Sequence, residues 1–374
     1  MTAEKISVGV NLLWLRSGRV GGSEDYAVRL VSAIPADAPV RLTLFAPRGF
    51  AQAHPSLADR HEVVVSPPAR SRPLRVFIEN TWLAAQCRRR DLAVVHHLGG
   101  TVPWLGVQPV IVTIHDLQPL DHPRRFSLVK RMYLKAMLPW SVRRAEAIAT
   151  VSEFCRSRLV ERLGVDSQRV AVLPAPVDAS LGTAEMPLAA AVPDLSHPFV
   201  LYPAVAYPHK NHEVLLRALS RLAADGVDVE LVATGGRGPQ DAKLDQLAVD
   251  LGVGRRWHRL GRIPRSVLDG LYRQAVATVF PSKYEGYGLP VVEAMARGCP
   301  VVAADVGALP EVVGMGGRLL DPDDDSQWAE AIAKLVVDSD SRRELSEAGL
   351  SRVSALAEVD SAAKLCRLYS QVAG

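Results

Sequence analysis

The stretch VFPSKYEGYGLPVVEAMARG, residues 279–298, combines an apolar run, a loop with two glycines and a helix-like segment. The apolar run that ends at Pro281 is typical of a strand in a parallel sheet covered on both faces. Pro290 suits the first turn of a helix, and Gly298 suits its end, because glycine readily adopts the left-handed conformation. The loop therefore follows the carboxyl end of a strand, where open parallel sheets bind their ligands.

The backbone of this loop is predicted to bind an anion. Gly286 and Gly288 let N–H groups approach a ligand closely, and a helix N-terminus adds about half a positive charge. Together these features form a site for a phosphate or diphosphate. The carboxylates of Glu285 and Glu293 flank the loop, and we expect them to bind sugar or ribose hydroxyls rather than phosphate. For each residue taken alone, an ordinary turn with water-facing glutamates is the alternative.

Short apolar runs alternate with helix-period segments along most of the chain, which predicts an α/β protein with two successive Rossmann-like sheets. The predicted domains are residues 1–177 and 199–352, joined by a Pro- and Ala-rich linker at 178–198, with a C-terminal helix in 353–374. Strands are predicted at 6–13, 40–45, 63–65, 93–97, 110–114, 147–151, 170–173, 199–203, 229–234, 257–260, 277–280, 300–304 and 317–320. Helices are predicted at 23–34 with Ser23 as its cap, and at 211–224, 239–251, 264–275, 290–297, 324–336, 339–350 and 354–373.

Length, composition and net charge exclude several classes of protein. A length of 374 residues, 48% hydrophobic and 22% charged, is typical of two globular domains and argues against a disordered or fibrous chain. No apolar run reaches the roughly 18 residues of a membrane span, and the N-terminus lacks the features of a signal peptide. The cysteines lie far apart without a CxxC pair, so we expect a reduced, cytoplasmic protein without a zinc site. The net charge of +4 and the lack of a recognised module argue against nucleic-acid binding.

The motif EGYGLPVVE resembles the signature of retaining, nucleotide-sugar-dependent glycosyltransferases of the GT-B architecture, in family 4 (group 1), and the likeness extends from Arg259 to Pro322. This resemblance implies two facing Rossmann-like domains with the active site between them, and a C-terminal helix that crosses back to the first domain. It also implies that Glu285 contacts the transferred sugar and that Glu293 binds the ribose hydroxyls. The residues implied to offer backbone contacts to the sugar and diphosphate are Gly286, Tyr287, Gly288 and Leu289.

Lys210 follows the predicted strand 199–203 at the start of a helix. An ammonium there can stabilise a diphosphate leaving group as its charge develops, although a lone surface lysine is the alternative. Lys210 matches a lysine of the family motif, and the resemblance gives it this catalytic, donor-binding role. Many members also carry an arginine just after a glycine, five residues before the lysine. Ala204 and Val205 stand at those positions here, and the sequence does not identify a replacement cation.

His115 and Asp116 directly follow the predicted strand 110–114. His115 could donate to a sugar hydroxyl or stabilise charge near the reacting carbon. Alternatively, Asp116 caps the next turn and His115 is a core residue. The resemblance favours the functional interpretation, because members of the family carry His-Asp in this context. Gly21 and Gly22 follow the first predicted strand, and they are implied to face the diphosphate or the acceptor.

Two charged stretches have competing interpretations. Asp323–Asp325 precede a predicted helix, where acids suit the macrodipole, so we expect no metal site there. The segment 124–144 mixes basic with apolar residues. It is either an interfacial segment that meets anionic lipid at the inner membrane face, or a surface helix whose apolar face packs on the first sheet.

The expected activity is transfer of a sugar from a nucleotide diphosphate sugar to a hydroxyl acceptor, with retention and without metal or cofactor. GDP-mannose is the first expected donor, because the pairing of His-Asp-Leu with Glu-Gly-Tyr-Gly-Leu-Pro looks most like bacterial mannosyltransferases; UDP- and dTDP-sugars remain open. The acceptor is a growing polysaccharide, a lipid-linked saccharide or a small molecule. The alternatives are a sugar phosphorylase, a nucleotide-sugar epimerase, and a nucleotide-sugar-binding module without catalysis.

Overall fold

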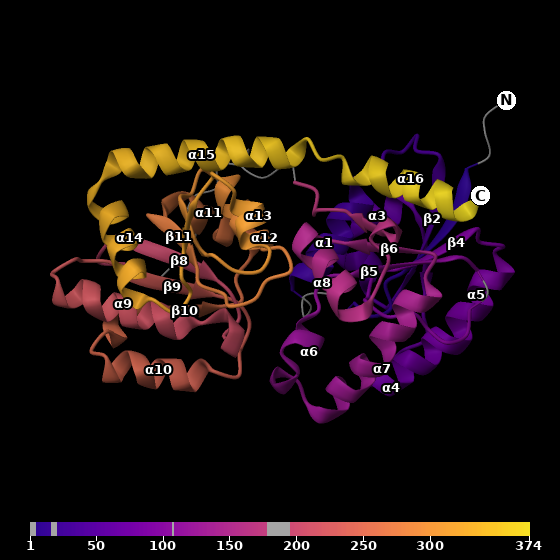
Figure 1. Cartoon of the computed structure of the whole chain (residues 1–374), viewed down its shortest axis with the longest axis horizontal. Coiled ribbons are helices and arrows are strands. Elements are labelled where there is room, and N and C mark those ends of the chain that lie inside the picture. The colour runs from indigo at the N-terminus through magenta and orange to yellow at the C-terminus, as the bar shows by residue number, and fades with distance from the viewer. Residues whose placement is uncertain (1–4, 16–20, 107, 178–194) are drawn as a thin grey trace. The chain divides into compact units, whose positions relative to one another are not determined.

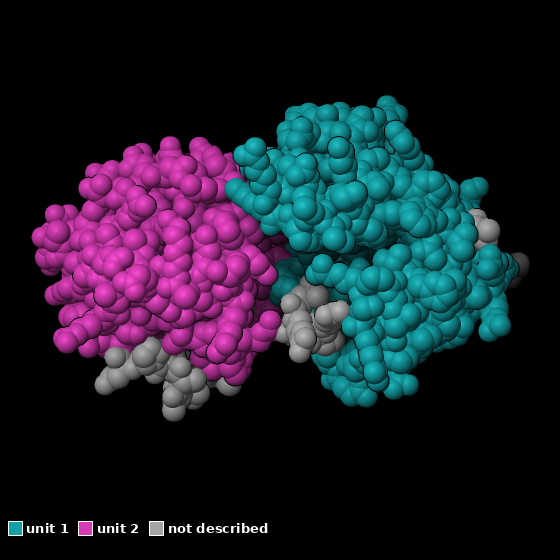
Figure 2. Space-filling view, turned by 90° about the horizontal axis from the view of Figure 1, so that it is seen from below, with its two compact units in different colours: residues 1–176, 359–374 teal, residues 177–358 magenta. Residues whose placement is uncertain are grey.

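The computed structural model describes residues 5–15, 21–106, 108–177 and 195–374. The chain divides into two compact units: unit 1 is Met1–Pro176 with Val359–Gly374, and unit 2 is Val177–Glu358. Figure 2 colours them teal and magenta. Each unit is a parallel sheet with helices, so the predicted α/β fold class is confirmed. Residues 178–194 of the predicted linker lie outside the described residues.

Unit 1 contains a seven-stranded sheet in the order β3-β2-β1-β4-β5-β6-β7. Its strands are β1 (Ile6–Asn11), β2 (Val40–Ala46), β3 (Glu62–Val65), β4 (Val94–His97), β5 (Val110–Ile114), β6 (Ala147–Thr150) and β7 (Val170–Val172). Every neighbouring pair is parallel, which places the carboxyl ends of all seven strands at one edge. The central strands β4, β5 and β6 are buried along their whole length, as continuous apolar runs in parallel sheets usually are.

The helices of unit 1 differ in length and in their part in the core. Leu138 and Val142 of one long helix pack against β5 and β6 in a cluster with Leu159 of the next helix. The helical segments are α1 (Gly22–Ser32), α2 (Phe50–Ala53), α3 (Pro55–Arg60), α4 (Arg72–Ile78), a π-helical turn (Glu79–Leu83), α5 (Ala84–Arg89), α6 (Gln118–Asp121), a 3₁₀ turn (Pro123–Arg125), α7 (Leu128–Arg144), α8 (Glu153–Leu163), a 3₁₀ turn (Ser167–Arg169) and α16 (Ser361–Ala373).

Unit 2 repeats this plan with a six-stranded parallel sheet in the order β10-β9-β8-β11-β12-β13. Its strands are β8 (Phe199–Pro203), β9 (Glu230–Thr234), β10 (Trp257–Gly261), β11 (Ala277–Phe280), β12 (Val301–Ala304) and β13 (Arg318–Leu320). Its helices are α9 (His212–Ala224), α10 (Asp241–Asp250), α11 (Arg265–Gln274), α12 (Leu289–Met295), α13 (Leu309–Val313), α14 (Asp325–Val337) and α15 (Ser339–Ala357), with 3₁₀ turns at Pro208–Lys210 and Gly254–Arg256.

Several predicted boundaries were wrong. Gly21, not Ser23, caps α1, and the cap makes no side-chain hydrogen bond. α15 continues to Ala357, so residues 353–357 belong to unit 2 and not to the returning helix. The short helices α2 to α6 and α13 were not predicted, because segments of four to seven residues give too little periodicity to be seen.

The C-terminal helix α16 belongs to the core of unit 1 and contacts β1, β4 and α1 (Figure 1). The Tyr369 hydroxyl lies 2.8 Å from His96 Nδ1, and His96 Nε2 lies 2.7 Å from the Thr113 hydroxyl. Burial is the main cause that lowers the pKa of His96 to about 3, so this histidine is neutral near pH 7. At the start of the helix, the Ser361 hydroxyl donates to the carbonyl of Pro174 at 2.8 Å.

We predict that Tyr369→Phe destabilises the protein by about 1–3 kcal/mol, because the buried His96 Nδ1 loses its only hydrogen-bond partner among the described residues. The free energy of unfolding from urea denaturation measures the effect. Tyr207→Phe is the control, since Tyr207 is 47% exposed. Equal stability of the two variants would contradict the prediction.

Candidate active site

Lys210 and Glu285 form an ion pair in unit 2. Lys210 ends the turn after β8, and Glu285 lies in the loop after β11; these two strands are parallel neighbours in the sheet. The Lys210 Nζ lies 2.5 Å from Glu285 Oε1, and the two side chains are 19% and 13% exposed. The predicted placement of both residues beyond the carboxyl ends of strands is therefore correct.

Hydrogen bonds fix the two loops relative to each other. Lys283 N donates to the carbonyl of His209 at 2.7 Å. The Tyr202 hydroxyl donates to the carbonyl of Lys210 at 2.5 Å and lies 3.2 Å from the Ser282 hydroxyl. The buried Tyr202 thus ties both loops to β8, and the ion pair rests on a rigid base.

Two glycines of the motif region occupy positions that a side chain could not. Gly288 caps α12 with a φ of 104°, and a Cβ there would lie 2.8 Å from the side chain of Leu309. Gly307 has a φ of 62°, and a Cβ there would lie 2.7 Å from the carbonyl oxygen of Glu285. Positive φ and close approach both demand glycine, so only glycine at these two positions allows the backbone conformation that the loop adopts. Gly286, Tyr287 and Leu289 lie in or directly after the same loop.

Glu293, the second glutamate of the motif, interacts with Arg265 and Tyr272. The guanidinium of Arg265 donates to its Oε1 at 3.1 Å, and the Tyr272 hydroxyl donates to its Oε2 at 3.5 Å. Glu293 is only 7% exposed, whereas the Arg265 side chain is 45% exposed. Arg265 was missed in the sequence, since nothing in its local pattern separates it from the other arginines of this region.

The loop at Ala204–Ala206, where the family arginine is missing, packs against the loop after β9. A Cβ on Gly235 would lie 2.9 Å from Val205 N, and one on Gly238 would lie 2.7 Å from Ala206 N. The guanidinium of Arg262 lies beside this loop, 3.5 Å from the position of a Cβ on Gly236. Arg262 therefore brings a positive charge to a loop that contacts the Ala204–Ala206 backbone.

His115 lies at the end of β5 in unit 1. Its Nε2–H donates to the carbonyl of Leu98 at 2.8 Å, and its ring lies edge-on to Tyr26 at a centroid distance of 5.1 Å. Burial lowers the pKa of His115, and the hydrogen bond to the Leu98 carbonyl opposes this shift. In the neutral ring with Nε2 protonated, Nδ1 is an acceptor. Nε2–H is thus used by the Leu98 carbonyl, so a contact between the ring and a sugar hydroxyl involves Nδ1, and the role of His115 stays a prediction.

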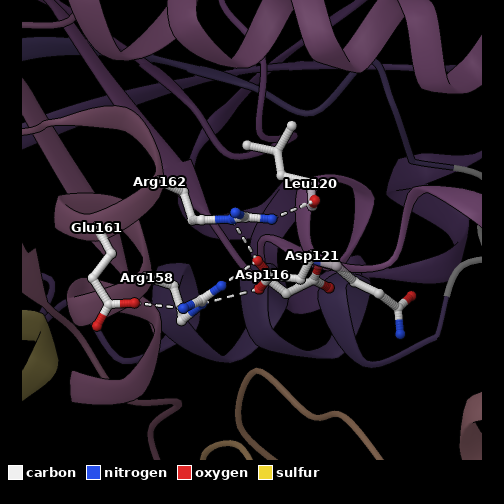
Figure 3. Close-up of polar contacts among 7 residues, drawn as sticks. Asp116, Leu120, Asp121, Arg158, Glu161 and Arg162 are labelled. Atoms are coloured by element: carbon white, nitrogen blue, oxygen red, sulfur yellow. Dashed lines mark hydrogen bonds and ion pairs between the residues drawn. The ribbon is translucent and has the colours of Figure 1, made fainter.

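Asp116 caps the turn that follows, since its Oδ1 accepts from Gln118 N at 3.0 Å. This matches the structural alternative considered for Asp116. Figure 3 shows how the next residues are anchored on α8. Asp121 pairs with Arg158 and Arg162, and Arg162 also donates to the carbonyl of Leu120 at 2.8 Å. The ion pairs hold the segment after His115 in place.

Gly21 and Gly22 are exposed at the start of α1. A Cβ on Gly21 would meet no described atom within 4 Å, so packing among the described residues does not require glycine there. Glu24 and Asp25 already place two carboxylates in the first turn, which weakens the attraction of this helix end for an anion. Gly18, in the same loop, lies outside the described residues.

The acidic run at 323–325 starts α14, as predicted. Asp324 Oδ1 accepts from Ser326 N at 3.1 Å and from Gln327 N at 3.2 Å. Hydrogen bonds from Ser326 and Gln327 lower the pKa of this carboxyl. Within the ranges that the structure describes, no group of three or more His, Cys, Asp or Glu residues could hold a metal ion.

Two family models match the chain, one in each half. "Glycosyltransferase Family 4" matches residues 20–181, and "Glycosyl transferases group 1" matches residues 190–352. The solved structure of sucrose-phosphate synthase from Thermosynechococcus elongatus is 21% identical and has a TM-score of 0.79 over 98% of this chain and 99% of that one. This likeness supports the fold alone.

Two curated relatives are O-antigen mannosyltransferases. RfbU, the O-antigen chain mannosyltransferase of Salmonella typhimurium, is 28% identical over 72% of this chain and 73% of its own length. O-antigen chain mannosyltransferase B of Escherichia coli is 33% identical over 65% of either chain. Together with the two matching models, they show that this chain belongs to the group 1, family 4-like glycosyltransferases of the GT-B fold and is a transferase enzyme.

Proposed function

We propose that the enzyme transfers mannose from a nucleotide diphosphate sugar, with GDP-mannose as the first candidate, to a hydroxyl acceptor with retention at the anomeric carbon. The observation that carries the proposal is the Lys210 ammonium, held beside Glu285 above neighbouring strands of one sheet. The names of the two O-antigen relatives support mannose as the sugar. The acceptor hydroxyl belongs to a saccharide, a lipid-linked saccharide or a small molecule.

Lys210 is proposed to stabilise the departing diphosphate. An ammonium has three N–H donors, and Glu285 accepts one of them, so donors remain for phosphate oxygens. The backbone of Gly286, Tyr287, Gly288 and Leu289 adds N–H groups in a conformation that requires glycine at 288 and 307. We assign the second positive charge to Arg262, in place of the arginine missing at Val205. With these charges the reaction needs no metal and no cofactor.

The remaining residues are proposed to orient the donor. Glu285 holds the transferred sugar, and Glu293, whose carboxylate is oriented by Arg265 and Tyr272, binds the ribose hydroxyls. His115 accepts a hydrogen bond from a hydroxyl of the transferred sugar through Nδ1, and the residues proposed to contact the donor also include Asp116, Gly21 and Gly22. The leaving diphosphate takes the acceptor proton, as the family resemblance implies, so no side chain has to act as general base.

Three other functions for the same fold are distinguished by their products. A phosphorylase would release a sugar phosphate only when inorganic phosphate is present. An epimerase would interconvert nucleotide sugars without an acceptor. A binding module would bind the donor tightly and show no turnover with any hydroxyl acceptor. Release of GDP that depends on a hydroxyl acceptor separates the proposed transferase from all three.

A weak contact with a membrane surface is proposed for the start of α7. Met137, Leu138 and Val142 in its second half are buried, so the packing interpretation holds for that half. Leu128 and Val129 at its start are 72% and 81% exposed. Basic residues accompany these exposed side chains on the same segment: Arg124, Lys130, Arg131 and Lys135.

An anionic lipid surface fits this combination of exposed apolar and cationic side chains. Burial is the main cause that lowers the pKa of Lys130, and the neighbouring Arg72 lowers it further, while Asp116 raises it. No described helix has the length and the apolar character needed to cross a bilayer. The proposed contact is therefore one at the surface.

We predict that Glu293→Ala removes most of the thermal stabilisation by the nucleoside diphosphate, because the ribose hydroxyls lose their acceptor. UDP, GDP, dTDP and ADP are each tested at a hundred times the dissociation constant, where one bound ligand adds about 2.7 kcal/mol. The control is Glu330→Ala, an exposed glutamate on α14. If the preferred nucleotide stabilises Glu293→Ala as much as it stabilises the parent protein, the ribose assignment is wrong.

We predict that Lys210→Ala lowers kcat by about 10²–10³-fold, because a charge that stabilises the leaving group is lost. Binding of the nucleoside diphosphate is expected to fall much less, which titration calorimetry measures on the same variant. Lys243→Ala, on the exposed surface of α10, serves as control. Equal losses in kcat and in binding would mean that Lys210 has only a structural role.

We predict that the parent protein co-sediments with vesicles that contain anionic lipid, and less so as salt increases. The triple variant Leu128→Ser, Val129→Ser, Met132→Ser is expected to lose most of this binding, because its apolar contact area is gone. Val337→Ser removes a comparably exposed residue of unit 2 and should leave binding unchanged. Binding that is insensitive to salt and to anionic lipid would rule out the proposed contact.

A further inference from the structure

Unit 1 contains a cavity of about 250 Å³ at the carboxyl ends of β1, β2 and β3. Its wall is formed by the residues directly after these strands and by α4. Ligands of open parallel sheets bind at this edge. The volume lies below the roughly 300–1,000 Å³ of sites for drug-sized ligands, so the cavity suits one small group of a larger substrate.

Three arginines line the cavity: Arg48 after β2, and Arg72 and Arg75 on α4. No acidic residue belongs to the described lining. Glu79 Oε1 lies 3.6 Å from Arg75 Nε and forms an ion pair with it. Arg48 and Arg72 have no ion pair among the described residues, so three positive charges line the cavity and one of them is paired.

The chemistry of the lining indicates the kind of ligand. Three guanidinium groups belong to one wall, and anionic oxygen is the strongest acceptor for their N–H donors. The lining therefore argues for an anionic ligand rather than for a neutral sugar ring.

Trp14 places this cavity next to the proposed chemistry. The Asn11 side chain accepts from Leu13 N at 3.0 Å and turns the chain after β1, so that Trp14 lies over Gly99. A Cβ on Gly99 would lie 2.6 Å from the Trp14 ring. The ring centroids of Trp14 and His115 are 6.2 Å apart. One side chain thus lines the cavity and neighbours the histidine assigned to the transferred sugar.

We infer that this cavity binds a phosphate or diphosphate group of the acceptor, through Arg48, Arg72 and Arg75. The inference rests on the proposed function, since it takes the ligand to be the acceptor of that reaction. Arginine suits this ligand because its planar fork of N–H donors matches phosphate oxygens in pairs. The enzyme then selects acceptors that carry a phosphate ester near the reacting hydroxyl, on either a lipid or a sugar.

Binding of inorganic pyrophosphate to the full chain, measured by titration calorimetry, tests the site without turnover. The double variant Arg48→Ala, Arg72→Ala is expected to raise Kd about tenfold for each arginine removed, and Arg48→Lys, Arg72→Lys to recover part of the loss. Arg70→Ala is the matched control, an exposed arginine of the same segment outside the lining. An unchanged Kd in the double alanine variant would overturn the inference.

Lys210→Ala separates this cavity from the donor site. Pyrophosphate binding should persist in that variant; if it is lost there and kept in the arginine variants, the anion binds in unit 2 and the inference is wrong. Competition by farnesyl diphosphate indicates a lipid-borne phosphate, and competition by mannose 1-phosphate indicates a sugar-borne one. Competition by glucuronate alone would overturn the assignment to phosphate.

The same measurements separate this inference from the proposed function. If the arginines bind pyrophosphate but no nucleotide sugar is turned over with any acceptor, the proposed function fails and the anion site stands. If GDP-mannose is turned over and the arginine variants bind pyrophosphate like the parent, the proposed function stands and the anion site is refuted.

Discussion

The ion pair between Lys210 and Glu285 joins the two loops on which the proposed chemistry of unit 2 depends. Both charges are mostly withdrawn from water, and each is tolerated there because the other compensates it. Their strands, β8 and β11, are the pair at which the order of the sheet reverses direction. Crevices of doubly wound sheets form at this reversal. The pair therefore keeps a cation and a carboxylate at the position where a diphosphate and its sugar would lie together.

Unit 1 shows the same reversal between β1 and β4, and its residues of interest again follow those strands. Trp14 comes after β1, and Gly99, on which it packs, comes after β4. The two units differ in the charges at this edge. Unit 2 has an ammonium paired with a carboxylate, whereas unit 1 has arginines around a cavity and a histidine whose pKa burial lowers. The same strand order thus carries two different sets of charges at its reversal.

The sequence was a good guide where burial and glycine dictate the structure. The predicted strands lie within about two residues of the observed ones, because continuous apolar runs in a two-sided sheet are easy to recognise. Gly288 and the loop that carries Glu285 were also predicted, since they belong to one local motif. The contact between Lys210 and Glu285 joins loops 75 residues apart, so the motif could predict the edge of the sheet but not the pair.

Other features depended on tertiary contacts that no local pattern reveals. Apart from β3, the region between β2 and β4 contains helical segments of four to seven residues, which are too short to show a periodic apolar face in the sequence. The partnership of Arg265 with Glu293 spans 28 residues and two helices. The direction of the hydrogen bond from His115 Nε2 to the Leu98 carbonyl depends on a tertiary contact, so the sequence could not show which ring nitrogen is already used.

The contribution of α16 to unit 1 has a consequence for biogenesis. Domains usually fold as units in the order in which the ribosome makes them. Here unit 1 lacks Tyr369, whose hydroxyl contacts the buried His96, until α16 has been synthesised. Unit 2 is complete in sequence before that moment. The half of the protein that is translated first is thus the last to be finished.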